Sequence, residues 1–123
     1  MASAAVTPLL FVIRTSPYQH TLAREAIDAL LGSAALGAAV KVLFSGDAVL
    51  HWLPDQAPPG GQKNLGAMLK ALPLYDIDEV YVDRDALTTR GLTVDILPPG
   101  VSALDAAALR HLLSQPGQQL VSF

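Results

Sequence analysis

Short, continuous runs of apolar residues alternate with helix-type patterns along most of this chain. The runs LLFVI at 9–13, VKVLFS at 40–45 and DEVYV at 78–82 contain the β-branched and aromatic residues that favour strands. Continuous apolar patterning is typical of a strand that is covered on both faces. Because helical stretches separate the runs, the chain is predicted to build βαβ units. We therefore expect one domain over residues 1–123: a single doubly wound, mostly parallel five-stranded α/β sheet with helices on both faces, of flavodoxin-like type.

The remaining elements are predicted from turn residues and helix-type spacing. Ser16, Pro17 and Gln19 have the spacing of a capping box with proline at the first helical position. Thr21 is the alternative start of that helix, and Ser102 is predicted to cap the last helix. Further helices are expected over 48–53, 63–72, 84–89 and 103–116, and two more strands over 93–97 and 119–123.

Composition excludes several classes of protein. The chain contains no cysteine, which excludes disulfides, thiolate metal sites and cysteine nucleophiles. A net charge of −3 without a Lys/Arg cluster argues against direct binding of nucleic acid. No apolar run approaches the roughly 20 residues that span a bilayer, and the N-terminus lacks the features of a signal peptide. We therefore expect a cytoplasmic protein without membrane contact.

The low charge content has two interpretations. Charged residues make up 15% of the chain, against about 25% in ordinary domains, and the mean hydropathy is +0.38. One interpretation is a habit of composition, since runs of alanine raise hydropathy without forming patches. The other is that part of the surface is buried by another chain, which predicts an oligomer.

Each predicted strand delivers polar residues to the same edge of the sheet. The candidate crevice residues at this carboxyl edge are Thr15, Ser16, Ser45, Asp47, Asp83 and Arg84. Thr15 and Ser16 could hold a phosphate at a helix N-terminus, but helix capping explains Ser16 without a ligand. Asp47 also precedes a helix, so capping is its default role.

Known cofactor and metal motifs do not occur at this edge. The first predicted strand is followed by RTSPYQH rather than by the glycine pattern of a dinucleotide fold, and no P-loop pattern appears. The three histidines, His20, His51 and His111, share no metal-ligand spacing. We therefore predict no cofactor and no metal.

The segment from Ala48 to Leu72 is the predicted contact surface for a partner. It combines few charges with an irregular Pro/Gly-rich loop and a bulky aromatic residue. The candidate contact residues are His51, Trp52 and Met68. For Trp52 a place in the core is an equal alternative.

At these residues the chain resembles the DsrE/DsrF-like superfamily, and within it the TusC (DsrF) branch. The matching segments are LLFVIRTSP, AREAIDALL, VLFSGDAVLHWLPDQ, LPLYDIDEVYVDRDALTTRGL and LRHLL with the closing QLVSF. The resemblance implies a doubly wound α/β fold and a sulfur-relay complex in which TusB-, TusC- and TusD-like chains assemble. It implies persulfide transfer towards tRNA 2-thiouridine, with a related complex serving sulfur oxidation. This chain would therefore have TusB-like and TusD-like (DsrH/DsrE-like) partners.

The resemblance also implies that Asp83 matches a functional position of related chains. In TusD/DsrE-like chains the relay cysteine lies just after the third strand, eight residues before the glycine of an RG pair. Counting back eight residues from Gly91 gives Asp83. A carboxylate cannot carry a persulfide, so the resemblance implies a non-catalytic subunit rather than an enzyme. Asp83 is then expected to cap the following helix by accepting N–H bonds from residues 85 and 86, with a polar contact to a partner as the alternative.

A function of another class stays open from the sequence. Thr15, Ser45, Asp47 and Asp83 could line the crevice of a small-molecule-binding, anion-binding or hydrolytic α/β domain unrelated to sulfur transfer. No nucleophile–base pair in the sequence supports that interpretation.

Overall fold

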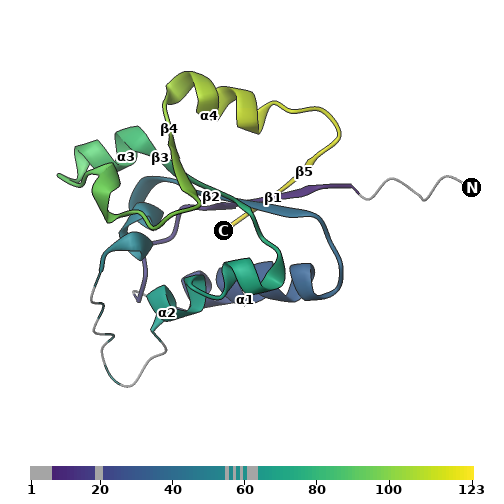
Figure 1. Ribbon diagram of the computed structural model, residues 1–123, viewed down its shortest axis with the longest axis horizontal. Helices are drawn as coiled ribbons and strands as arrows, with labels where there is room; N and C mark the ends of the chain where they lie inside the picture. The colour runs from purple at the N-terminus through teal and green to yellow at the C-terminus, as the bar shows by residue number, and fades with distance from the viewer. Residues whose placement is uncertain (1–6, 19–20, 55, 57, 59, 61–63) are drawn as a thin grey trace, which may run out of the picture.

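The computed structural model describes residues 7–18, 21–54, 56, 58, 60 and 64–123. Within these residues five parallel strands form one sheet in the order β4-β3-β2-β1-β5 (Figure 1). The strands are β1 (Leu9–Ile13), β2 (Val40–Phe44), β3 (Glu79–Asp83), β4 (Val101–Leu104) and β5 (Gln119–Ser122). The chain adds strands in one direction from β1 to β4 and then returns to pair β5 with the free side of β1.

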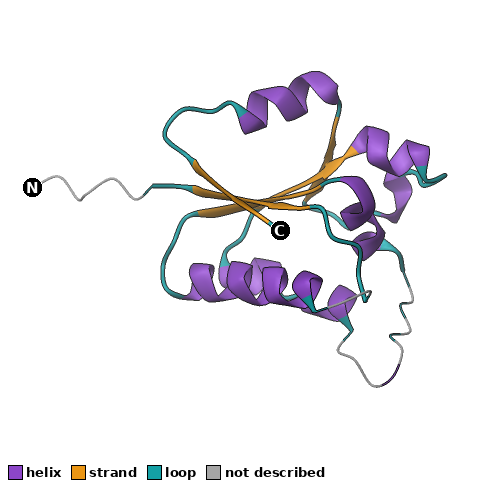
Figure 2. Cartoon of the chain, turned by 180° about the vertical axis from the view of Figure 1, so that it is seen from behind, coloured by secondary structure: helices purple, strands orange, loops and turns teal. Residues whose placement is uncertain are grey.

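Helices cover both faces of the sheet. The α-helices are α1 (Leu22–Ala35), α2 (Leu65–Leu69), α3 (Arg84–Thr89) and α4 (Ala106–Leu113), and the 3-10 helices are η1 (Gly46–Trp52), η3 (Leu72–Tyr75) and η4 (Val94–Ile96). Seen from behind, α1 and α2 lie below the sheet and α4 lies above it (Figure 2). The predicted fold class, a doubly wound α/β sheet, is confirmed. None of the helices in the described ranges is long and apolar enough to cross a membrane.

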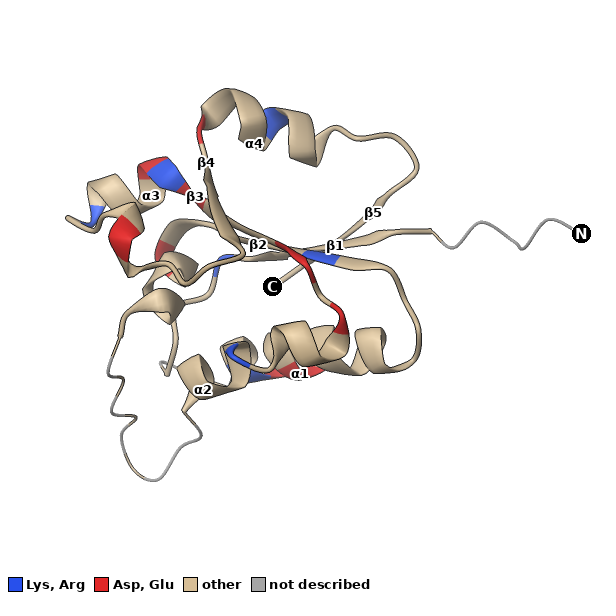
Figure 3. Cartoon of the chain, in the orientation of Figure 1, with Lys and Arg blue, Asp and Glu red and all other residues tan. Residues whose placement is uncertain are grey.

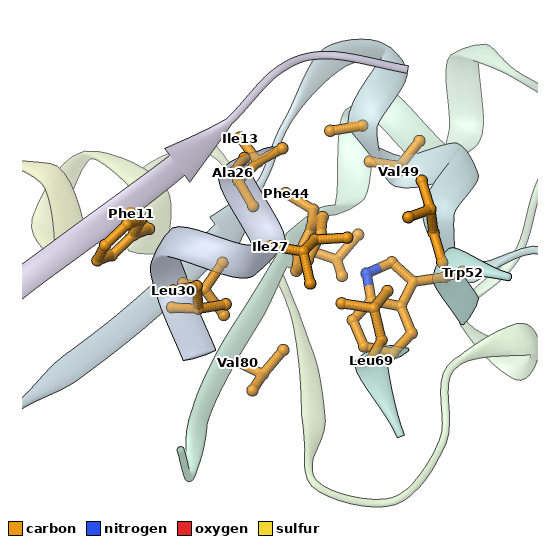
Figure 4. Close-up of a cluster of buried hydrophobic side chains, with 14 of the residues drawn as sticks. Phe11, Ile13, Ala26, Ile27, Leu30, Phe44, Val49, Trp52, Leu69 and Val80 are labelled. Atoms are coloured by element: carbon orange, nitrogen blue, oxygen red, sulfur yellow. The ribbon is translucent and has the colours of Figure 1, made fainter. Parts of the chain in front are cut away.

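The central strands β1 and β2 are buried on both faces, as their continuous apolar patterns predict, whereas the edge strands β4 and β5 keep much of their surface exposed. Phe11 and Ile13 of β1 belong to the larger core cluster, on the side of α1, whereas Leu10 and Val12 belong to a smaller cluster under α4. Figure 4 shows the larger cluster, where side chains from the sheet meet those from α1, α2 and η1. The core is therefore concentrated on the α1 side, and α4 alone supplies the buried helical residue of the smaller cluster, Leu112.

The predicted fourth strand over 93–97 is wrong. Val94–Ile96 forms η4, and the strand that pairs with β3 is Val101–Leu104. After α3 the chain lies at the carboxyl edge of the sheet, and a parallel strand has to begin at the amino edge. Residues 90–100 make that return, so a strand directly after Gly91 would come too early.

Ser102 does not cap the last helix, because it lies within β4. The cap is Asp105, whose carboxylate accepts a hydrogen bond of 2.8 Å from the backbone N–H of Ala108. Asp is among the strongest N-cap residues, and Asp105, directly after β4, accepts a hydrogen bond from a free N–H group in the first turn of α4.

Ser16 is also not a helix cap. Helix α1 begins at Leu22, after Thr21, and Tyr18 has a left-handed backbone with φ of 68°. The Tyr18 hydroxyl donates to Gln56 Oε1 and accepts a 3.0 Å hydrogen bond from the backbone N–H of Leu65. These contacts across 38 and 47 positions hold Tyr18 outside the helix, which local capping rules do not anticipate. Gln19, the other half of the predicted box, lies outside the described residues.

The predicted helix over 63–72 is divided into two elements. Asn64 caps α2, since its side chain accepts a 3.0 Å hydrogen bond from the Ala67 backbone N–H. The helix ends after Leu69, and Pro73 lies inside η3 rather than closing α2. A proline is tolerated in the first turn of a helix, where its missing N–H has no intrahelical partner.

Candidate functional site

Asp83 is the last residue of β3 and the N-cap of α3. Its Oδ1 accepts a 3.3 Å hydrogen bond from the Ala86 backbone N–H, and its Oδ2 accepts a 3.3 Å hydrogen bond from the Ser45 hydroxyl. The predicted capping role is confirmed for Ala86. Because Ser45 follows β2, the second bond joins the carboxyl ends of two neighbouring strands. Both carboxylate oxygens of Asp83 are thus used within the chain.

The cap at Asp83 gives a direct prediction. Asp83→Ala should lower the free energy of unfolding by about 1 kcal/mol, because the Ala86 N–H loses its acceptor. Asp83→Asn should be nearly neutral, because a side-chain oxygen remains. Urea denaturation midpoints of both variants measure this, with Asp105→Ala as a matched cap deletion at α4. Equal losses for Asn and Ala at position 83 would contradict the cap and make the charge itself the important feature.

Asp47 is held by an arginine rather than by a helix N-terminus. Arg90 Nη2 lies 2.7 Å from Asp47 Oδ1 and Arg90 Nε lies 3.2 Å from the same atom, while Arg90 Nη1 donates to the Ala86 carbonyl at 3.0 Å. The predicted cap at Asp47 is wrong, since Ser45 precedes η1 and makes no side-chain cap either. Sequence reasoning missed Arg90; the only signal was a cation just after a short helix. The pair ties η1 to α3.

Arg84 does not join this crevice group. Its side chain is exposed on α3, where it lines a surface hollow with Leu87 and Thr88. The structure therefore brings together Ser45, Asp83 and the Asp47–Arg90 pair, and it leaves Arg84 at the side.

Thr15 acts at this edge through its backbone carbonyl, and Ser16 is buried. The Thr15 carbonyl accepts a 3.0 Å hydrogen bond from His51 Nε2, and Ser16 is 8% exposed. Neither residue starts α1, which begins six positions after Ser16, so the free N–H groups of its first turn are not presented at Thr15 or Ser16. The predicted phosphate-binding alternative loses its physical basis at these residues.

His51 is a buried, neutral side chain. It is 1% exposed, and its ring lies 5.6 Å from that of Phe44. A carbonyl can only accept, so Nε2 carries the proton that bonds Thr15, and Nδ1 has no hydrogen-bond partner among the described residues. Burial lowers the pKa of His51 below 6.5, and the hydrogen bond to Thr15 offsets part of this. His51 therefore forms no nucleophile–base pair with Ser45, whose hydroxyl bonds Asp83 instead.

The lowered pKa of His51 predicts a loss of stability in mild acid. The unfolded chain takes up a proton near pH 6.5, whereas the folded chain resists it until lower pH. Stability is therefore fully present above about pH 6.5 and falls as the pH drops from there towards the folded pKa. Urea denaturation midpoints between pH 7.5 and pH 5 measure this.

A paired set of variants isolates the contribution of His51. His51→Gln should reduce the acid-dependent loss, because it removes the titrating ring, while His111→Gln, on the exposed side of α4, should retain it. An identical pH profile for His51→Gln and the unmodified chain would contradict this assignment.

His51 and Trp52 were predicted contact residues, and the structure places both in the core. Trp52 is 9% exposed, and its ring makes an edge contact with Phe44 at 5.2 Å between centroids. This burial favours the core interpretation of Trp52 over the interface interpretation. Met68 packs against the same cluster but keeps part of its surface, so it is the one of the three with area left for a partner.

Chemically, the carboxyl edge is a structural polar cluster. The described residues contain no group of three or more His, Cys, Asp or Glu side chains that could hold a metal ion. The Asp47 carboxylate is paired with Arg90, and both oxygens of Asp83 accept hydrogen bonds within the chain. The absence of cysteine from the whole chain means that no thiol is available to carry sulfur.

These features define a doubly wound α/β domain in which the end of β3 carries a helix-capping carboxylate. The chain belongs to the DsrE/DsrF-like family, whose family model matches residues 8–123. A protein of Vibrio vulnificus strain CMCP6 named "Protein TusC homolog" is 38% identical over 119 residues, covering 96% of this chain and all of that protein. A protein of the same name from Pseudomonas aeruginosa is 40% identical over 111 residues, covering 89% and 93% of the two chains. The resemblance to the TusC branch is thereby confirmed.

Solved structures support the fold. The crystal structure of the ychN protein from E. coli has a TM-score of 0.77 at 20% identity and covers 95% of this chain and 99% of that one. A conserved protein of unknown function from Bacteroides thetaiotaomicron has a TM-score of 0.72 at 16% identity over the full length of both chains.

Proposed function

We propose that this chain is a non-catalytic subunit of a sulfur-relay complex that supports persulfide transfer towards tRNA 2-thiouridine in the cytoplasm. Its partners would be TusB-like and TusD-like chains, the TusD-like chain carrying the relay cysteine. Membership of the DsrE/DsrF-like family and the similarity to proteins named TusC homologs support this assignment.

The residue at the end of β3 carries the proposal. If the relay cysteine of a TusD-like chain stands at this address, Asp83 replaces the sulfur carrier with a carboxylate whose oxygens already bond Ala86 and Ser45. A carboxylate cannot form a persulfide, and its negative charge would repel a persulfide anion. Asp83 therefore has a structural role in this chain, and a partner chain carries the persulfide.

The surface offers room for such partners. Large apolar side chains are exposed at several places, among them Leu53 at 38%, Leu113 at 37% and Leu120 at 46%. Leu120 lies on the α4 side of the edge strand β5, which pairs with β1 and has no second neighbouring strand within the described ranges. Edge strands with exposed apolar side chains favour association with another chain.

The experiment that tests the function is tRNA analysis in a strain that lacks this gene. The 2-thiouridine content at the wobble position of tRNA should fall when the gene is deleted and return when the unmodified gene is supplied. Asp83→Asn should restore it equally well, because the cap needs only an oxygen. Unchanged tRNA thiolation in the deletion strain would overturn the tRNA role and leave sulfur oxidation as the process to examine.

A further inference from the structure

The two most exposed large apolar side chains lie at the amino edge of the sheet, far from the carboxyl-edge cluster. Leu36, just after α1, is 91% exposed, and Leu74, in η3, is 84% exposed. Tyr75 beside it is 39% exposed, whereas no other large apolar residue among those described exceeds 46%. The residues that follow the two leucines in the chain, Gly37 and Tyr75, line the same hollow, so both leucines belong to one region. Two leucines exposed in one region form an apolar patch, and covering it with a partner would be favourable.

A hollow of about 460 Å³ opens beside these leucines. The hollow is lined by Ala34 and Gly37, which lie before and after Leu36 in the chain. Tyr75 and the first residues of β2 line it as well. Strands β2 and β3 begin here and end at Phe44 and Asp83, so the hollow lies at the edge of the sheet opposite to Asp83. An occupant of the hollow would leave the carboxyl edge free.

The rim of the hollow is acidic. Asp76, Asp78 and Glu79 line it with one cation, Lys41, whose Nζ donates to Gln115 at 3.1 Å. Figure 3 shows this acidic stretch running from the end of η3 to the start of β3, next to the end of α1. All three carboxylates are exposed. The potential at this edge therefore favours cations and repels nucleic acid and anionic membranes.

The same charges disfavour a second copy of this chain. A symmetric dimer through this surface would bring the same three carboxylates of each copy close together. We propose instead that the amino edge is a docking site for a segment of another protein that carries an apolar side chain between lysines or arginines. The apolar side chain enters the hollow against Tyr75, the rest of the segment covers the neighbouring Leu36 and Leu74, and the flanking cations lie on the acidic rim. This site does not depend on the sulfur-relay role.

Fluorescence anisotropy with a defined peptide tests the proposal. The probe is a fluorescein-labelled peptide with a Leu-Phe pair between two Arg-Lys pairs, titrated with the purified full chain. Binding should weaken several-fold when salt is raised from about 0.05 M to about 0.5 M, because exposed charges are then screened. Matched peptides with glutamate in place of the cations, or serine in place of Leu-Phe, should bind at least about tenfold more weakly.

Variants of the chain locate the site. Leu36→Ser with Leu74→Ser should weaken peptide binding by at least about tenfold. Asp76→Asn with Asp78→Asn should weaken it and reduce its salt dependence, and Asn tolerates the left-handed backbone of Asp76, whose φ is 59°. Val94→Ser, in η4, where Val94 is 43% exposed, is the matched control and should leave binding unchanged. Thermal midpoints confirm that each variant is folded.

Three results would overturn the proposal. The first is no binding of the basic peptide by the folded chain. The second is binding that the Leu36 and Leu74 variants leave unchanged, which would place the peptide elsewhere. The third is loss of self-association in those variants without any peptide, seen by light scattering, which would make a second copy the occupant.

Discussion

Trp52→Ala should lower the free energy of unfolding by about 3–5 kcal/mol, as removal of a large buried aromatic side chain does. Trp52 is 9% exposed and packs on Phe44 and the surrounding core, as Figure 4 shows. The change would open a cavity where the end of η1 meets α2 and the sheet. Urea denaturation followed by circular dichroism measures the loss.

Trp52→Phe is the matched control and should cost much less. It keeps an aromatic ring against Phe44 and removes the indole N–H, which has no hydrogen-bond partner among the described residues. A buried N–H without a partner costs about 1–3 kcal/mol, so its removal offsets part of the lost packing. If Trp52→Ala instead kept the stability of the chain and abolished complex formation, Trp52 would be an interface residue.

Phe44→Ala should destabilise the chain by a similar amount, about 3–5 kcal/mol. Phe44 ends β2, is fully buried, and contacts the rings of both His51 and Trp52. Its loss removes the aromatic ring that packs against both His51 and Trp52. Denaturation midpoints measure the change, and Phe44→Leu, which keeps most of the apolar volume, should cost less than half as much.

A double-mutant cycle tests whether the two aromatic rings act together. Because Phe44 and Trp52 are in contact, their combined loss should differ from the sum of the single losses by about 0.5–3 kcal/mol. Additive losses would mean that the 5.2 Å edge contact contributes no specific energy beyond burial.

The sequence predicts the interior of this fold better than its edges. LLFVI reads as a strand covered on both faces because its burial depends only on local apolar pattern, and β1 is buried as predicted. The fourth strand was misplaced because its position depends on topology: the chain has to cross from one sheet edge to the other before a parallel strand can begin. Val94 and Ile96 match a strand pattern locally but are used in that crossing.

The candidate site shows the same division. Asp83 was predicted as a cap because strand end and helix start are adjacent in the chain, and the Ala86 bond lies three positions away. The Asp47–Arg90 pair joins residues 43 positions apart, and no local rule connects them. The spacing at Ser16 predicts a capping box, and this prediction fails because the hydrogen bonds of Tyr18 keep that turn out of α1. Those bonds join distant parts of the chain and cannot be predicted from neighbouring residues.

We expect this chain to be a structural subunit that assembles with TusB-like and TusD-like chains. Size-exclusion chromatography with light scattering on the three chains, co-expressed from one source, tests it most directly. We expect one soluble heteromeric species that contains all three chains, whereas this chain expressed alone should self-associate or aggregate. A stable, well-behaved monomer that elutes separately from both partner chains would contradict it.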